Sequence, residues 1–307
     1  MYAPIVVFAY NRPNHLDKTL SALALNAEAN RSKLFIYIDG PKDKKGKLVN
    51  CEVESVAKKY SSGYFKEVKI KNSISNKGLA KSVINGVTEI INEYNKVIVI
   101  EDDSVPSRYY LSFMNSALDY YEKDSRIWSI GGYTIPIKRL DDYCNDIIMT
   151  QRSSSYAWAT WEDRWNKVDW EVSDYKNFHW NFYNRRQFNR WGNDRSSMLD
   201  DQMNGRIDSW AIRFDYAMFE NKMYNIIPSR SLIENIGHDG SGTHNALDKS
   251  GTFSLKVDLS REVKYSFLSD IKVNEQIRTE FHKTFSYSWY ALTKRFIGNL
   301  VYKNRWR

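Results

Sequence analysis

Three consecutive acids, Glu101-Asp102-Asp103, follow the strand-like run Lys96 to Ile100 and are the densest chemical signal in the sequence. Acids at the end of a buried strand repel one another and lose hydration, so a cation or a set of donors must offset the cost. Hard carboxylate oxygens suit Mn²⁺ or Mg²⁺, which often bind one or two carboxylates together with substrate phosphates. The alternative is that Asp102 or Asp103 caps a following helix. The strand that precedes them favours the metal interpretation.

A glycine- and histidine-rich loop, Gly237 to His244, is the second signal. Glycines let backbone N–H groups approach phosphate oxygens closely, and histidine can bind a metal or donate to a diphosphate. His238 and His244 are therefore candidates for metal or diphosphate contact. The alternative is an ordinary surface loop.

Alternating strands and helices must position these residues. We expect a mostly parallel sheet, buried on both faces and joined by right-handed crossovers, because short apolar runs alternate with amphipathic helices. The expected strands are Ile5 to Ala9, Leu34 to Ile38, Tyr64 to Ile70 and Lys96 to Ile100, and the expected helices are Asn14 to Leu25, Cys51 to Ser61 and Leu79 to Tyr94.

Three of these strands end in polar residues, namely Tyr10-Asn11-Arg12, Asp39-Gly40 and Glu101-Asp102-Asp103. In parallel sheets, ligands bind outside the carboxyl ends of the strands. The three polar endings therefore predict one site at that edge, whatever the family of the protein.

The strand followed by Glu101-Asp102-Asp103, together with Val6 to Pro13, resembles the GT-A glycosyltransferases. The pattern is most similar to the β-1,2-N-acetylglucosaminyltransferase I group and to related bacterial family-2-like enzymes of surface-polysaccharide synthesis, over roughly residues 4 to 245. The resemblance implies an α/β, Rossmann-like GT-A fold with a mixed, mostly parallel sheet flanked by helices and a helical C-terminal extension. It also implies inverting, metal-dependent transfer of an N-acetylhexosamine or hexose from a UDP-sugar to a hydroxyl of a glycan or lipid-linked saccharide.

The resemblance divides the chain into a nucleotide-sugar-binding half (1–133), an acceptor-binding half (134–250) and a basic, aromatic extension (251–307). From Ser104 onward we expect a helix at Tyr109 to Lys123, a strand at Trp128 to Tyr133 and a last strand at Ile226 to Pro228. Two further segments, Ser154 to Trp165 and Asp208 to Asn221, are expected to form an acceptor-facing layer with helices.

Residue roles also follow from the resemblance. Asp103 would contact the metal that bridges the diphosphate, Glu101 and Asp102 would face the sugar and ribose, and Asp39 would bind the uracil edge. The residues that would wall the nucleotide are Ala9, Tyr10 and Arg12. Asn76 and Lys81 lie in a segment similar to one beside the nucleotide in many family-2 enzymes, although Asn-x-Gly at a helix start is also common turn chemistry.

A second carboxylate should remove the proton of the acceptor hydroxyl as that oxygen attacks the anomeric carbon. The family has its base in a Trp-Asp-Asp-Trp segment, and Asp208 in Ile207-Asp208-Ser209-Trp210 occupies the corresponding place, although Ile207 and Ser209 depart from the pattern. Glu162 is the next candidate, and the neighbouring Asp163 and the pair Asp200-Asp201 complete the set. Alternatively, Asp208 caps a helix and Glu162-Asp163-Arg164 forms a surface ion pair.

Composition bounds the remaining possibilities. The formal charge of +8 indicates polyanionic partners, and residues 289–307 alternate aromatic and basic residues like an interfacial helix, so we expect contact with a membrane surface. The aromatic fraction of 15% suggests that some rings line a groove. Cys51 and Cys144 show no metal or disulfide spacing, and neither a signal peptide nor a membrane span is visible, so we expect a cytoplasmic protein, peripheral on the inner membrane face.

Three rival functions use the same observations. A sugar nucleotidylyltransferase would share the fold, but the place of its glycine-rich phosphate loop holds Tyr10-Asn11-Arg12-Pro13. A glycoside hydrolase needs two facing carboxylates and no nucleotide. A carbohydrate- or nucleic-acid-binding protein without transferase activity would leave the acid triplet without a purpose, and no nucleic-acid motif is present.

Overall fold

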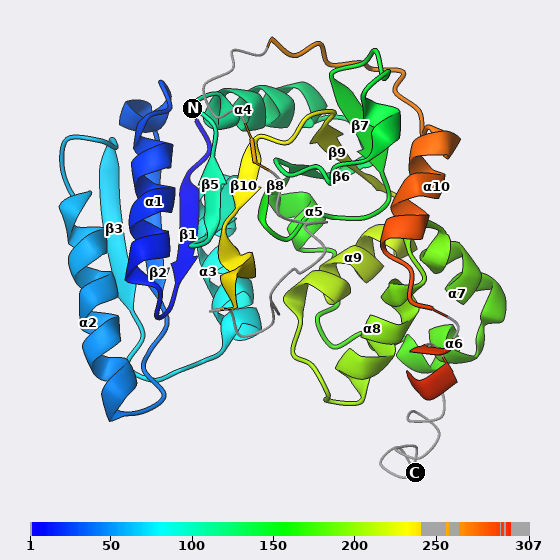
Figure 1. Cartoon of the computed structure of the whole chain (residues 1–307), viewed down its shortest axis with the longest axis horizontal. Helices are drawn as coiled ribbons and strands as arrows, with labels where there is room; N and C mark the ends of the chain where they lie inside the picture. Colours follow the sequence, from blue (N-terminus) through cyan, green and yellow to red (C-terminus); the bar gives the residue numbers. More distant parts are fainter. Residues whose placement is uncertain (1, 241–255, 258–263, 289, 292, 296–307) are drawn as a thin grey trace.

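An eight-stranded mixed sheet forms the centre of the molecule, in the order β3-β2-β1-β4-β8-β6-β9-β7. The structure, a computed structural model, describes residues 2–240, 256–257, 264–288, 290–291 and 293–295 (Figure 1). The first four strands are parallel to one another, and the pair β6 and β9 is also parallel. Strands β8 and β7 run antiparallel to their neighbours. The predicted α/β fold with a mixed, mostly parallel sheet flanked by helices is confirmed.

The first half of the chain alternates strands and helices as predicted. Its elements are β1 (Ile5–Ala9), α1 (Pro13–Ala24), β2 (Lys33–Ile38), α2 (Lys44–Lys59), β3 (Glu67–Asn72), α3 (Leu79–Tyr94) and β4 (Lys96–Glu101). Helix α2 begins earlier than expected, because the Asp43 carboxylate accepts a hydrogen bond from the backbone N–H of Gly46 and caps the first turn.

The second half completes the sheet and adds a lobe of helices. Its elements are β5 (Ser104–Pro106), α4 (Tyr110–Tyr121), β6 (Ile127–Gly131), β7 (Ile147–Thr150), β8 (Ala157–Trp161), α5 (Glu162–Trp165), α6 (Tyr175–Trp180), α7 (Phe182–Phe188), α8 (Asp194–Met203), α9 (Trp210–Glu220), β9 (Tyr224–Pro228), β10 (Ile233–Asn235) and α10 (Glu275–Thr284). Helices α6, α7 and α8, with α10 beside them, lie at one end of the molecule (Figure 1). We call α6 to α8 the helical lobe.

The core lies on both faces of the sheet because each central strand buries alternate residues on opposite sides. Ile5, Val7 and Ala9 of β1 pack in the cluster that contains α1 and α4, whereas Val6 and Phe8 pack with α3 and α9. One sheet therefore spans the boundary expected at residues 133 and 134, and the two predicted halves share a core.

The expected acceptor-facing layer at Ser154 to Trp165 is wrong for its central residues, whereas Glu162–Trp165 do form a short helix, α5. Residues Ala157 to Trp161 form β8, a buried strand between β4 and β6. Its tryptophans are core residues, since the Trp158 ring stacks on Trp165 and on Trp210 at centroid distances of 5.7 and 4.9 Å. The run was misread because Trp is less typical of a buried strand than Val or Ile.

A small second sheet was not expected from the sequence. Strand β10 pairs antiparallel with β5, with Asn235 opposite Ser104 and Ile233 opposite Pro106. This ladder joins the residues after Asp103 to those before Gly237. It therefore brings the acid triplet and the start of the glycine-rich loop together.

Candidate active site

Arg12, which follows β1, lies between Asp102 and Asp103, which follow β4. Its guanidinium hydrogen-bonds to Asp102, and its Nη1 lies 2.9 Å from Asp103 Oδ2. The backbone N–H of Asp102 donates to the carbonyl of Phe8 at 3.1 Å, which holds the two strand ends side by side. The predicted convergence of Arg12 with the acid triplet is confirmed.

The acid triplet carries more charge than one guanidinium can balance. Burial raises the pKa of Asp102 to about 7, with Arg12 opposing the shift and Asp103 adding to it. Burial and the two neighbouring acids also raise the pKa of Glu101. Burial lowers the pKa of Arg12, but Asp102 and Asp103 more than compensate and raise it above its usual value. The cluster therefore favours a proton or a further cation.

The start of the glycine-rich loop packs directly against Asp103. A Cβ built on Gly237 would lie 2.1 Å from Asp103 Oδ2, and the backbone N–H of Ile236 donates to the Asp103 carbonyl at 2.9 Å. The imidazole of His15, on α1, contacts the Ile236 carbonyl at 3.3 Å and the Asp239 carboxylate at 3.2 Å. A side chain at position 237 would therefore have to displace the Asp103 carboxylate.

At least one oxygen of the triplet remains available for a cation. Asp103 Oδ1 is buried and has no hydrogen-bond partner among the groups that the structure describes, and the same is true of the nearby Asn235 Nδ2. The described residues contain no cluster of three His, Cys, Asp or Glu side chains suited to a metal. A divalent cation at Asp103 fits this donor set if a ligand supplies phosphate oxygens, as is common for Mg²⁺.

Asp39 anchors the loop before α3 in this structure. Its Oδ1 accepts from the backbone N–H groups of Gly40 and Lys77, both at 2.9 Å. Its Oδ2 accepts from the Asn76 amide and from the backbone N–H of Gly78, both at 3.0 Å. All four acceptor positions of the carboxylate are thus used. The structure brings Asn76 and Asp39 together, whereas Lys81 is exposed on the first turn of α3.

Two polar residues that the sequence analysis missed, the half-buried Asn50 and the buried Thr19, hold the strand ends in place. The Asn50 amide on α2 donates to the carbonyls of Tyr10 and Asp39 at 3.1 and 2.8 Å. The Thr19 hydroxyl on α1 donates to the Asp102 carbonyl at 2.8 Å. Neither residue belongs to a recognisable motif, so only the fold identifies them.

Tyr156 is a third missed residue, and it lies beside the triplet. Its carbonyl accepts from the backbone N–H of Glu101 at 3.3 Å, and its ring lies 5.0 Å from Tyr133 and 6.3 Å from His238 between centroids. Burial raises the pKa of Tyr156, with smaller contributions from Tyr133, Glu101 and Asp103. The structure therefore brings His238 to the site, while His244 falls outside the described residues.

Glu162 lies at the opposite edge of the sheet from the triplet. Strand β8 is antiparallel to β4, so Lys96 pairs with Trp161 whereas Ile100 pairs with Ala157. At about 3.3 Å per residue, Glu162 is separated from Glu101 by the length of β4. This geometry corrects the assignment of Glu162 as a base, and its neighbours Asp163 and Arg164 form the expected ion pair at 2.6 Å.

Asp208 lies on the same edge as the triplet. Helix α9 leads into β9, which is parallel to β6, so α9 begins at the carboxyl edge of the sheet. Asp208 precedes α9, its side chain is 65% exposed, and it pairs with Arg213 Nη2 at 3.0 Å. Ser209, not Asp208, caps the helix by accepting from the backbone N–H of Ile212. Asp208 is thus exposed at this edge and paired with Arg213, and it does not cap the helix.

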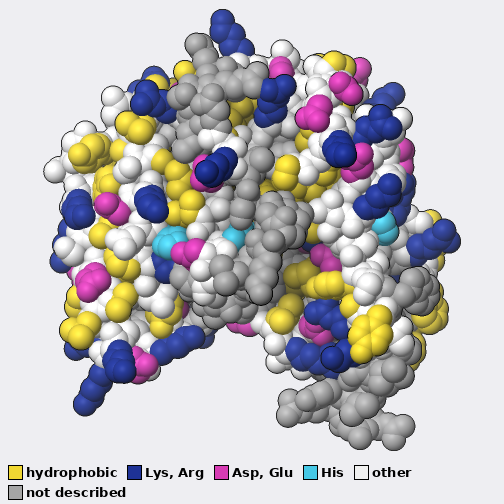
Figure 2. All heavy atoms as spheres, viewed as in Figure 1, with side chains coloured by type: hydrophobic (Ala, Val, Ile, Leu, Met, Phe, Trp, Pro, Cys, Tyr) yellow, Lys and Arg dark blue, Asp and Glu magenta, His cyan; other side chains and the backbone are white. Residues whose placement is uncertain are grey.

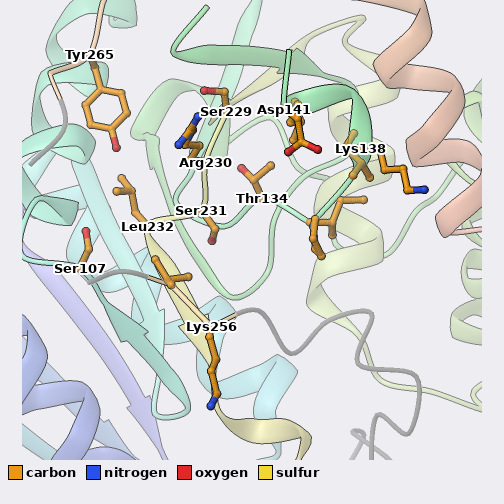
Figure 3. A pocket seen from close by; sticks show the side chains of 15 residues that line it. Ser107, Thr134, Lys138, Asp141, Ser229, Arg230, Ser231, Leu232, Lys256 and Tyr265 are labelled. Carbon is orange, nitrogen blue, oxygen red and sulfur yellow. The ribbon is translucent and has the colours of Figure 1, made fainter. Parts of the chain in front are cut away.

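A cavity of about 670 Å³ opens beyond the ends of β6 and β9 (Figure 3). Thr134, Ser231 and Arg230 lie near one another in it, whereas the Lys138 ammonium points away from them. Leu232 also lines the cavity and directly precedes β10, whose other end leads to Gly237. The cavity and the acid triplet therefore lie at opposite ends of one short strand.

Comparisons with known proteins match only solved structures, at low identity. No family model and no curated protein matches the sequence. The structure of S. aureus TarS 1-349 in complex with UDP-GlcNAc is 12% identical with a TM-score of 0.45, covering 76% of this chain and 58% of that one. The same protein in complex with UDP gives 13%, 0.44, 76% and 60%. A cytidylyltransferase from Leptospira borgpetersenii serovar Hardjo-bovis gives 11%, 0.35, 55% and 64%.

This chain thus spans less than two thirds of the length of each of these structures. Similarities this distant transfer no residue role and no substrate. The chemistry of the site follows from its own residues.

Proposed function

We propose that the protein is a glycosyltransferase that moves a sugar from a nucleotide-sugar, with a UDP-sugar favoured, to a hydroxyl of a glycan or lipid-linked saccharide. The observation that carries the proposal is the convergence of Arg12, Asp102 and Asp103 beneath Gly237, at the carboxyl ends of neighbouring strands. A guanidinium, buried acids and a close glycine backbone suit a diphosphate and its counter-ion. The cavity along the same edge offers room for an acceptor.

Binding of the nucleotide-sugar would use both the positive and the negative side chains of the cluster. Arg12 would contact the diphosphate, and Glu101 and Asp102 would face the sugar and ribose. Mn²⁺ or Mg²⁺ at Asp103, with His238 nearby, would offset the negative charge that develops on the departing diphosphate. His244 remains a proposed contact from the same loop.

The nucleoside would lie beside the ends of β1 and β2. Ala9 and Tyr10 would form one wall, and Asn76 and Lys81 would approach from the loop and first turn of α3. Asp39 would contact the uracil edge only by giving up one of its four present hydrogen bonds.

Transfer with inversion requires a base on the acceptor side. The Asp208 carboxylate would take the proton of the acceptor hydroxyl while that oxygen forms the new bond to the anomeric carbon and the bond to the diphosphate breaks. Its position at the start of α9 supports this role, because that end of the helix lies on the same sheet edge as the triplet. By its resemblance to bacterial enzymes, the protein would act in surface-polysaccharide synthesis on the cytoplasmic side of the membrane.

The test is ligand-dependent thermal stabilisation followed by product analysis. UDP with Mn²⁺ should raise the melting temperature of the parent chain more than either alone, and Asp103→Ala should abolish the gain. A screen of nucleotide-sugars should then show release of the nucleoside diphosphate, and the anomeric configuration of the product would report inversion. A nucleotidylyltransferase would instead form pyrophosphate from a nucleoside triphosphate. If no nucleoside diphosphate with metal stabilises the chain, the proposal is wrong.

A further inference from the structure

The outer end of the helical lobe carries an unusual set of exposed rings. Trp180, Phe182 and Tyr183 are 55%, 78% and 70% exposed, and they fall within four consecutive residues. Soluble proteins seldom expose contiguous large apolar side chains unless the surface meets a partner or a membrane. This cluster lies where α6 ends and α7 begins.

The charged residues of the same segment are all basic. From Tyr175 to Asn193 the sequence contains four Lys or Arg residues and no acid. Two of them, Lys176 and Arg186, are exposed and form no ion pair with another described residue. The segment therefore attracts anions at the position where its rings are exposed.

Helical spacing places these cations beside the rings. Lys176 and Trp180 are four residues apart on α6, and Arg186 lies four residues after Phe182 and three after Tyr183 on α7. Residues at these spacings share a helix face. We call Lys176, Trp180, Phe182, Tyr183 and Arg186 the aromatic–basic surface.

A buried ion-pair network holds this surface rigidly. Arg185 forms two hydrogen bonds to Asp200 on α8, at 2.8 and 2.7 Å, and Tyr175 and His179 contact the same carboxylate at 2.9 and 3.2 Å. These three side chains turn inward from α6 and α7. The exposed rings are consequently presented on helices that are fixed to α8.

The surface lies away from the acid triplet. Helices α8 and α9 separate α6 and α7 from the strands that carry the triplet (Figure 1). Basic and hydrophobic side chains lie next to each other over the helical lobe in Figure 2. The described end of the chain adds Tyr290, 79% exposed, and Lys294, on a segment that Arg295 ties to Asp201 of α8 at 2.8 Å.

We propose that the aromatic–basic surface docks on a lipid bilayer that contains anionic lipids. Trp and Tyr rings settle at the headgroup level, Phe inserts slightly deeper, and Lys and Arg attract the anionic headgroups. Buried apolar area and electrostatic attraction to anionic lipids together set the strength of such interfacial binding. Single-stranded nucleic acid would instead be expected in a basic groove with stacked rings, whereas these rings lie at the outer end of a lobe.

The inference goes beyond the proposed function, because it concerns a separate surface and does not depend on any activity. None of the described helices is long and apolar enough to span a membrane. On a bilayer, the aromatic–basic surface would orient the sheet edge relative to the membrane plane.

Vesicle sedimentation with the full chain tests the proposal. The protein should sediment with phosphatidylcholine–phosphatidylglycerol vesicles and remain in solution with phosphatidylcholine alone. Replacing Trp180, Phe182 and Tyr183 together by Ser should weaken binding by roughly tenfold or more. The pair Lys176→Glu and Arg186→Glu should weaken it by about tenfold or more as well.

The matched control is Lys44→Glu with Lys45→Glu, which changes net charge equally at exposed positions on α2, at the opposite end of the molecule. This variant should bind vesicles as the parent chain does. Circular dichroism and thermal melting should be unchanged in every variant, because all sites are exposed. Unchanged vesicle binding by both surface variants would overturn the proposal, as would equal loss in the α2 control. Loss of RNA binding without loss of vesicle binding would assign the surface to nucleic acid instead.

Discussion

Gly237 and Asp103 are in direct contact, so close that a Cβ at position 237 would lie 2.1 Å from Oδ2 and 2.8 Å from Cγ of the carboxylate. The backbone of Gly237 also donates to the Asn235 side chain at 2.8 Å. The glycine therefore lets the chain pass over the acid without displacing it. Its φ angle is not in the left-handed region, so the requirement for glycine is one of space alone.

Gly237→Ala should separate the loop from Asp103. Overpacking of this kind costs about 1–3 kcal/mol, and we expect weaker binding of UDP with Mn²⁺ by calorimetry together with a modest fall in melting temperature. Gly46→Ala is the control, because a Cβ there would meet its closest atom at 3.4 Å. If Gly237→Ala binds the nucleotide as tightly as the parent chain, the loop has no part in donor binding.

Arg12→Met should leave Asp102 and Asp103 buried beside each other without their cation. Breaking a buried pair in this way costs about 3–5 kcal/mol, which denaturant unfolding should detect. Arg12→Lys should recover only part of the loss, because one ammonium cannot reproduce the fork that reaches both carboxylates.

The control is Arg126→Met, which removes an exposed guanidinium 2.7 Å from Asp124. Exposed pairs contribute about 1 kcal/mol or less. Equal losses in the Arg12 and Arg126 variants would show that the Arg12 cluster is solvated and does not hold the strand ends together.

Asp208→Asn should reduce transfer by about 10²–10⁴-fold, while the thermal shift caused by UDP with Mn²⁺ stays the same. Glu162→Gln, at the far edge of the sheet, should leave both quantities unchanged. The measurement is the rate of nucleoside diphosphate release with and without acceptor. Full transfer activity in Asp208→Asn would show that Asp208 is not the base and would leave the other acids on this edge as candidates.

Asp200 should make stability depend on acid pH. Burial raises its pKa, but the hydrogen bonds from Arg185, His179 and Tyr175 outweigh burial and lower it to about 2, from an ordinary 3.8. Because this pKa is lower in the folded chain than in the unfolded chain, the ionised Asp200 carboxylate stabilises the fold above about pH 4. This stabilisation is lost as the pH falls from about 4 toward 2. The amount is about 2 kcal/mol.

Asp200→Asn should abolish this part of the pH dependence and lower stability at pH 7, as followed by urea unfolding across the range. Asp163→Asn is the control, because the Asp163 carboxylate is 63% exposed although it also pairs with an arginine. If the stability of the parent chain falls between pH 4 and pH 2 no more steeply than that of Asp200→Asn, the assigned pKa is wrong.

The half of the fold that carries the acid triplet could be predicted from the sequence, because β1, β2 and β4 are continuous apolar runs that end in polar residues. Strand β8 was missed since Ala157-Trp158-Ala159-Thr160-Trp161 lacks the β-branched run that marks a buried strand. The sequence also does not indicate that β8 runs antiparallel to β4. This direction alone places Glu162 at the edge of the sheet opposite the acid triplet.

The contacts of the site were less predictable than its location. The sequence indicates that Asp39 ends a strand, but whether its carboxylate faces a ligand or the loop at Asn76 depends on how that loop folds. Arg12 could be placed beside the triplet, but its insertion between two acids is a property of packing. Thr19 and Asn50 carry no local signal, because their partners are carbonyls of distant strands.

The β5–β10 ladder also sets the order in which the site can form. It joins Ser104 to Asn235, and the His15 contact with Ile236 spans 221 positions of the chain. Contacts of such long range close large loops and are slow to form compared with local ones. During synthesis, β1, β2 and β4 can pair long before the segment around Gly237 leaves the ribosome. A nascent chain would thus carry an uncovered acid triplet until the segment around Gly237 is made, and the site would be completed late in folding.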